Sequence, residues 1–227
     1  MAELLLRILS FIATFAPVAI YSLIVYLSFP KRSVNLTQAP IFFFGGVLCV
    51  AVLQPVFYIF PAISDPIERT LVWIVFQMFF QVGLLEEGAK MLIYSQVVRY
   101  YEKNNANTHI FMFMSLSCGF AAAENFTYLM SDGPGTVLTR AFTAVVLHMS
   151  VGVIAGRYWY EKKRIKGLLL AIFFHGFYDA SLAVGYYLGS VKLGILISIT
   201  SVLVFALYCC RDVLNERLTA IFFTKET

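Results

Sequence analysis

The amino-acid sequence predicts an all-α polytopic membrane protein, a bundle of about seven transmembrane helices. Of its 227 residues, 60% are hydrophobic and only 13% are charged, whereas soluble globular proteins carry about 45–50% apolar and about 25% charged residues. Seven apolar stretches approach or exceed the roughly 20 residues that a spanning helix requires, and they lack the alternation of barrel strands. The composition excludes a soluble enzyme, a disordered chain and a nucleic-acid-binding module. Residues 1–227 are expected to form one membrane-embedded domain.

The expected spans follow one another with short connections. They cover residues 8–29, 39–63, 70–96, 109–131, 136–157, 167–189 and 192–210. The first is interpreted as a retained span, because it has the length of a spanning helix and no small-residue cleavage site at its end. Only Gly189, Ser190 and Val191 separate the last two, so a tight turn is required there. The segment from Arg211 to Thr227 is expected to be a short amphipathic or frayed tail.

Charge in the connecting segments predicts which side of the bundle faces the cytoplasm. Four basic residues lie on the side of the N-terminus, namely Arg7, Arg69, Arg140 and Lys192. Twelve lie on the other side, namely Lys31, Arg32, Arg99, Lys103, Arg157, Lys162, Lys163, Arg164, Lys166, Arg211, Arg217 and Lys225. Because basic loops face the cytoplasm, the N-terminus is expected outside and the C-terminus in the cytoplasm. Topology alone accounts for the basic run at residues 161–166.

Six ionisable side chains are expected near the bilayer midplane, where a charged group costs about 2.5–3.5 kcal/mol on insertion scales. They are Glu86, Glu87, Glu124, His148, His175 and Asp179. Each lies within about four residues of the centre of its span, which is about 6 Å along a helix. Groups at one depth on successive helices indicate a shared polar cavity rather than scattered stabilising pairs.

The spacing of these residues predicts their contacts. His175 and Asp179 are four residues apart, so the carboxylate can orient the imidazole or both can meet one metal ion. Glu86 and Lys90 have the same separation, in the order that favours an ion pair. Glu86 and Glu87 project about 100° apart, so we expect one of them to face the cavity. Lys90 is expected to pair with an acid and to extend toward the cytoplasm.

Carboxylates and neutral histidines bind divalent ions and exchange protons with an attacking water. Ser150 lies two residues from His148 and Cys118 lies opposite Glu124, so a covalent nucleophile is disfavoured. The set favours water activated by a glutamate, with or without a metal. Two other classes stay open. A proton or metal-ion transporter also uses midplane carboxylates and histidines, and a non-catalytic scaffold would bind membrane segments in the same cavity.

The motifs occur in a fixed order on four successive spans. They are Glu86-Glu87-x-x-Lys90, Phe120-x-x-x-Glu124-Asn125, a lone His148, and His175-x-x-x-Asp179. This order, within a core of about residues 70–190, resembles the PrsW family of intramembrane proteases, which is related to CAAX-processing and bacteriocin-processing membrane proteases. The resemblance implies cleavage of membrane proteins, for example an anti-sigma factor, in a bacterial cell membrane. CAAX-processing relatives commonly carry a histidine where Glu124 stands, which makes prenylated substrates less expected.

Carried over residue by residue, the resemblance makes Glu86 and Glu87 the catalytic glutamates. It places Glu124, His148 and His175 at the other active-site positions. Asp179 matches the last motif acid and is expected to orient His175, while Lys90 is expected to have a structural role.

The family has been classed both as metal-dependent and as glutamate-dependent, so the cofactor stays open. A histidine, or Zn²⁺ or another divalent ion held by Glu124, His148 and His175, would stabilise the oxyanion. The expected partners are a membrane-protein substrate and the lipid bilayer, with no nucleic acid. The sequence leaves open which paired glutamate is the base and what the oligomeric state is.

Overall fold

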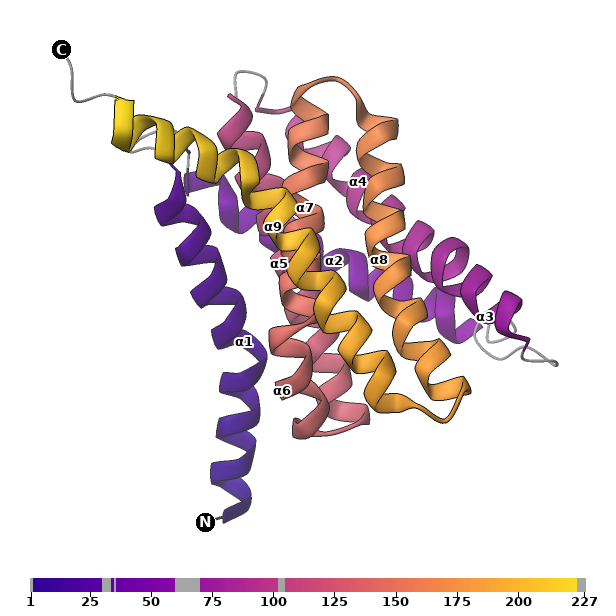
Figure 1. The fold of residues 1–227 in the computed structure, drawn as a ribbon. Coiled ribbons are helices and arrows are strands. Elements are labelled where there is room, and N and C mark those ends of the chain that lie inside the picture. The colour runs from indigo at the N-terminus through magenta and orange to yellow at the C-terminus, as the bar shows by residue number, and fades with distance from the viewer. Residues whose placement is uncertain (1, 30–33, 35, 60–69, 102–104, 224–227) are drawn as a thin grey trace.

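The computed structural model describes residues 2–29, 34, 36–59, 70–101 and 105–223 (Figure 1). Over these residues the chain is helical and contains no strand, which confirms the all-α prediction. The helices are α1 (Ala2–Ser28), α2 (Ala39–Ile59), α3 (Leu71–Phe76), α4 (Leu84–Val98), α5 (Ala106–Ser131), α6 (Pro134–Phe142), α7 (Ala144–Tyr160), α8 (Arg164–Tyr187) and α9 (Val191–Phe223). A 3₁₀ turn, Leu36–Gln38, precedes α2, and a π-helical segment, Gln77–Gly83, joins α3 to α4.

Five helical segments of the described chain are long and apolar enough to cross a membrane. They are Leu36–Ile59, Leu71–Val98, Pro134–Tyr160, Arg164–Tyr187 and Val191–Cys209. Within α1 the apolar stretch Thr14–Leu27 is shorter, and the predicted fourth span, α5, contains several polar residues and is not among the five. The start of α1 and the end of α9 lie at opposite ends of the bundle (Figure 1). The count of seven spans and the orientation of the termini stay predictions.

The described elements change two of the expected boundaries. The predicted fifth span is not continuous, because α6 and α7 meet at Thr143, where φ is −120° and ψ is −74°. The helix of the last span continues as α9 to Phe223, past the predicted end at residue 210. The tight turn before α9 is confirmed, and Gly189 has φ +69°, a conformation that glycine adopts without steric cost.

Several sequence predictions fall on positions outside the described residues. The predicted end of the second span, 60–63, lies there, as do five of the basic residues used for orientation. These five are Lys31, Arg32, Arg69, Lys103 and Lys225.

Helix α5 lies in the middle of the bundle, between α2 and α7, and α8 packs against α7 and α9 (Figure 1). Small residues allow the close approach. A Cβ at Gly119 would overlap the backbone of Phe43 in α2, and one at Gly156 would lie 2.6 Å from the carbonyl oxygen of His109 in α5. Small residues have this packing role at the interfaces of membrane helices in general. The close packing brings polar side chains of neighbouring helices within hydrogen-bond distance.

Candidate active site

The six predicted midplane side chains meet inside the bundle. Glu86 and Glu87 come from α4, Glu124 from α5, His148 from α7, and His175 and Asp179 from α8. The two imidazole rings are 5.0 Å apart between centroids, at an interplanar angle of 85°. The shared depth that the sequence predicts therefore corresponds to one cluster in the structure.

Glu87 and Lys90 form the most deeply buried part of the cluster. Lys90 Nζ donates to Glu87 Oε1 at 2.7 Å and to His148 Nδ1 at 3.1 Å, and it lies 3.8 Å from the centre of the Phe120 ring. The Lys90 side chain has 0% exposure, so the prediction that it extends toward the cytoplasm is wrong. The prediction that Lys90 pairs with an acid is confirmed, but its partner is Glu87, three residues away, and not Glu86, which the four-residue spacing favoured.

His175 connects the two paired glutamates. Its Nδ1 lies 2.7 Å from Glu87 Oε1 and forms a hydrogen bond with it. Its Nε2 lies 3.2 Å from Asp179 Oδ2 and 3.5 Å from Glu86 Oε2. The predicted contact of His175 with Asp179 is therefore formed. The Nε2 edge of the ring faces two carboxylates at once.

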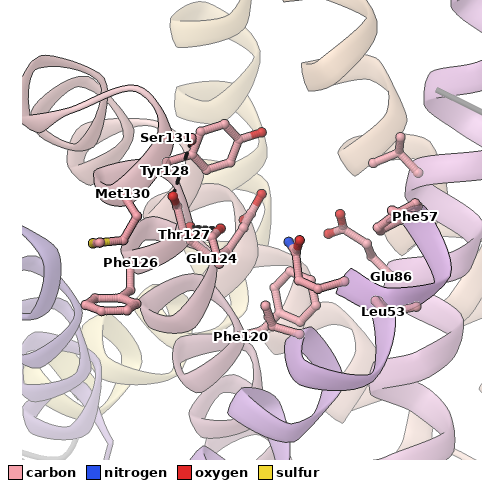
Figure 2. Close-up of a pocket in the computed structure, with 13 residues that line it drawn as sticks. Leu53, Phe57, Glu86, Phe120, Glu124, Phe126, Thr127, Tyr128, Met130 and Ser131 are labelled. Atoms are coloured by element: carbon pink, nitrogen blue, oxygen red, sulfur yellow. Dashed lines mark hydrogen bonds between the residues drawn. The ribbon is translucent and has the colours of Figure 1, made fainter. Parts of the chain in front are cut away.

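Glu86 differs from the other buried acids, because its Oε2 has no hydrogen-bond partner among the described residues. The carboxylate reaches a cavity of about 660 Å³. Figure 2 shows Glu86 from α4 and Glu124 from α5 on two sides of this cavity, with Phe120 between them. Much of the remaining wall is apolar and includes Leu53 and Met130. The cavity therefore combines an apolar wall with two carboxylates.

Glu124 is held by a residue that the charge distribution of the sequence placed only among the basic residues of the outer side. Arg140, from α6, lies with a terminal guanidinium nitrogen 2.6 Å from Glu124 Oε2. Its Nε donates to Asn125 Oδ1 at 2.9 Å, and its guanidinium carbon lies 4.0 Å from the centre of the Tyr128 ring. One signal for this placement is Pro134, which is typical of the first turn of a helix and marks α6. A helix there turns Arg140 inward, so the side chain is only 11% exposed.

Three residues have donor atoms close enough to share one metal ion. Donor atoms of Glu86, His148 and His175 all lie within 4.8 Å of one another, while ligands at the Zn–N distance of about 2.1 Å lie about 3.4 Å apart. The set predicted from the sequence contained Glu124 in place of Glu86. The Glu86 carboxylate, whose Oε2 has no hydrogen-bond partner among the described residues, belongs to this group, which suits a cation.

The hydrogen bonds around the two rings fit the same conclusion. Glu87 contacts Nδ1 of His175, the ring nitrogen opposite the Nε2 that faces Glu86, as carboxylates beside metal-binding histidines do. Because a lysine ammonium only donates, His148 Nδ1 accepts from Lys90, and its Nε2 proton points to Glu124 at 2.9 Å. An ion at His148 Nε2 would displace that proton, as metal binding to histidine generally requires. The residues present therefore fit a divalent ion.

A family model described as PrsW family intramembrane metalloprotease matches residues 36–208. Protease PrsW of Oceanobacillus iheyensis is 32% identical over 143 residues, covering 59% of this chain and 66% of the relative. The Halalkalibacterium halodurans protein of the same name is 34% identical over 153 residues, with coverage of 62% and 67%. That of Geobacillus kaustophilus is 31% identical over 167 residues, with coverage of 67% and 72%.

The aligned region therefore spans about two thirds of the length of these relatives. No solved structure matches the chain. The family match and the relatives confirm the resemblance that the order of the motifs indicated. They also agree with the predicted class of enzyme and with a location in the membrane.

Proposed function

This chain belongs to the PrsW family of intramembrane metalloproteases, and we propose that it hydrolyses peptide bonds of membrane proteins in the cavity beside Glu86. The observation that carries the proposal is the position of the Glu86 carboxylate. Its Oε2 is buried without a hydrogen-bond partner among the described residues. The same side chain lines the cavity and belongs to the cluster with the two histidines.

In the proposed reaction, Glu86 is the general base. A water beside its carboxylate attacks the carbonyl carbon of the scissile peptide bond, and Glu86 accepts the proton from that water. The C–N bond of the tetrahedral adduct then breaks as Glu86 returns the proton to the leaving amine nitrogen, which leaves a carboxylic acid and an amine as products. Glu87 is less suited to this role, because its Oε1 already accepts hydrogen bonds from Lys90 and His175. This assigns the two adjacent acids different tasks, which the sequence left open.

His148 and His175 face the same space as Glu86, and these three residues would hold the divalent ion that the family's description implies. Such an ion, when bound, supplies polarisation of the substrate carbonyl and lowers the pKa of a bound water. Glu87 keeps the His175 ring in orientation through the hydrogen bond to Nδ1 at 2.7 Å, and Lys90 does so for His148 through Nδ1 at 3.1 Å. Glu124 contacts the opposite edge of the His148 ring, at Nε2. Asp179 supports His175 from the other side of the ring.

The apolar wall of the cavity supports a membrane-embedded or membrane-adjacent segment as the substrate, with the membrane segment of an anti-sigma factor as one candidate. Phe57 and Phe126 line the cavity together with the two carboxylates. A helical substrate keeps its carbonyl oxygens in backbone hydrogen bonds, so it must unwind locally before a water can reach one of them. We therefore expect substrates whose cleaved segment contains residues with weak helix propensity, such as glycine or proline.

The test is cleavage in reconstituted vesicles. The purified chain is mixed with a single-span substrate that carries a tag at each end, and the products are identified by mass spectrometry. Wild type is compared with Glu86→Gln and with Asp132→Asn, an exposed acid at the end of α5 outside the cluster. We expect Glu86→Gln to lose at least about 10²-fold in rate and Asp132→Asn to cleave normally. A Glu86→Gln variant that cleaves at the wild-type rate would contradict the proposal.

A further inference from the structure

A second cavity, of about 430 Å³, lies where the end of α4, the start of α5 and the connection from α7 to α8 come together. Arg99 at its wall is thirteen residues beyond Glu86 on the chain, about 20 Å along a helix. The cavity is therefore separate from the cluster described above. It lies on the side of the bundle that the basic loops predict to be cytoplasmic.

Three cations line this cavity, and no acidic side chain among the described residues does so. They are Arg99, Lys162 and Arg164. None of the three forms an ion pair with a side chain in the described part of the chain. The acid of the adjoining turn, Glu161, accepts instead from Arg157 Nε at 3.1 Å and from Lys163 Nζ at 3.0 Å. The positive charge in the cavity is therefore not neutralised by this acid.

Aromatic side chains hold the inner surface of the cavity in place. The guanidinium carbon of Arg164 lies 4.0 Å from the centre of the Trp159 ring, and Trp159 itself is 7% exposed. His109 is fixed through its Nδ1, which lies 2.8 Å from the hydroxyl oxygen of the fully buried Tyr94. Stacking leaves the edge of a guanidinium free to donate hydrogen bonds. Arg164 is thus oriented before a ligand arrives.

We propose that this cavity binds a phosphate group, such as the headgroup of an anionic phospholipid. Guanidinium and ammonium groups form strong charge-assisted hydrogen bonds to phosphate oxygens. Tryptophan and tyrosine rings are enriched at the depth of lipid headgroups, and Trp159 and Tyr160 both line the cavity. Topology alone explains basic residues in this loop. It does not explain three of them around one cavity while their neighbours Arg157 and Lys163 pair with Glu161.

The position of Trp159 gives a direct measure of binding. The chain has two tryptophans, so a Trp73→Phe background leaves Trp159 as the only tryptophan. Its emission is titrated in detergent with dihexanoyl phosphatidylglycerol, dihexanoyl phosphatidylcholine or inorganic phosphate, and lipid retention is counted by native mass spectrometry. We expect a saturable change with phosphatidylglycerol and at least about tenfold weaker binding of the zwitterionic lipid.

Variants separate the cavity from the general charge of the loop. Arg99→Gln and Lys162→Gln each remove one lining cation and should weaken binding about tenfold. Lys163→Gln removes the same charge from the adjacent residue, whose side chain pairs with Glu161 and does not line the cavity, and should bind like the parent. The assay does not depend on proteolysis, so its outcome is independent of the proposed function.

Each outcome decides the proposal. Saturation by phosphatidylglycerol alone supports a lipid headgroup as the ligand, and saturation by inorganic phosphate as well supports a site open to soluble phosphates. Equal binding of phosphatidylcholine would overturn it. The same holds if Arg99→Gln and Lys162→Gln match Lys163→Gln, or if neither a fluorescence change nor retained lipid is observed.

Discussion

The ionisable cluster has two halves with opposite character. In the closed half, Glu87 and Lys90 have 1% and 0% side-chain exposure, and each is hydrogen-bonded to another member of the cluster. In the open half, Glu86 and Glu124 line the 660 Å³ cavity, and Glu86 keeps an oxygen without a hydrogen-bond partner among the described residues. The two adjacent glutamates of α4 therefore belong to different halves.

This difference indicates which residues support the structure of the site and which ones take part in the reaction. Removing one member of a buried ion pair destabilises the folded protein, because the charge of the other member stays buried without a partner. A carboxylate that lines a cavity and has an oxygen without a hydrogen-bond partner keeps the capacity to accept a proton. We infer that the closed half holds the geometry and that the open half carries out the reaction.

His175 touches both halves, so its removal should have the largest effect. His175→Ala deletes the hydrogen bond to Glu87 and the contacts of Nε2 with Glu86 and Asp179. We expect cleavage to fall by about 10²- to 10⁴-fold and the bound-metal content of the purified chain to drop. Rates in vesicles and elemental analysis measure the two effects. Cleavage by this variant at the wild-type rate would contradict the role of His175 as the link between the two halves.

The closed half is tested by stability rather than by activity. Lys90→Met leaves Glu87 buried without its ammonium partner, so we expect a loss of about 3–5 kcal/mol in the free energy of unfolding. Thermal melting of the detergent-solubilised chain checks this. Adding Glu87→Gln to Lys90→Met removes the unpaired charge and should recover part of the loss. A Lys90→Met variant as stable as the wild type would mean that the pair has no supporting role.

Arg140 tests the outer side of the open half. Arg140→Gln removes the cation 2.6 Å from Glu124 and the hydrogen bond to Asn125. We expect a 10- to 100-fold loss of cleavage, which is about the effect of losing a residue that positions an active-site group. The cleavage rate of Arg140→Lys should lie between those of the wild type and Arg140→Gln, because lysine keeps the charge but cannot bond Glu124 and Asn125 through one planar group. Equal rates for all three proteins would show that Glu124 needs no such support.

The smallest effect is expected at Asp179, which is 21% exposed and contacts only one edge of His175. Asp179→Asn keeps an oxygen that can accept a hydrogen bond from the ring but removes the charge. We expect cleavage to fall about tenfold or less, with an unchanged melting temperature. A loss as large as that of His175→Ala would give Asp179 a direct role in the reaction.

Much of the fold was predictable from two kinds of residue whose position a membrane restricts, namely those in long apolar runs and the ionisable residues within these runs. Long apolar runs gave the helices, and ionisable residues at one depth indicated their meeting point, because isolated charges are too costly in a bilayer. The interruption at Thr143 was missed, since the hydropathy of 136–157 does not change there. A side-chain contact stabilises this position, with the Thr143 hydroxyl 2.9 Å from the hydroxyl of Tyr178 in α8.

The details of the site depended on contacts between helices, which spacing does not encode. Glu86 and Glu87 are both within one turn of Lys90, and the sequence favoured the acid four residues away. In the structure Lys90 pairs with Glu87 instead. Contacts from other helices accompany this pairing, since His175 of α8 contacts Glu87 through Nδ1 and His148 of α7 contacts Lys90. Arg140 lies near the start of the predicted span 136–157 and was counted only as a basic residue of the outer side, because hydropathy does not show that α6 ends at Phe142 and turns this side chain toward Glu124.

The most direct test of the division between the halves compares Glu86→Gln with Glu87→Gln in the same preparation. Cleavage in vesicles and thermal melting are measured for both. We expect Glu86→Gln to melt like the wild type but to lose at least about 10²-fold in cleavage rate, whereas Glu87→Gln should melt at a lower temperature. Cleavage by Glu86→Gln at the wild-type rate, or destabilisation by Glu86→Gln alone, would contradict this division.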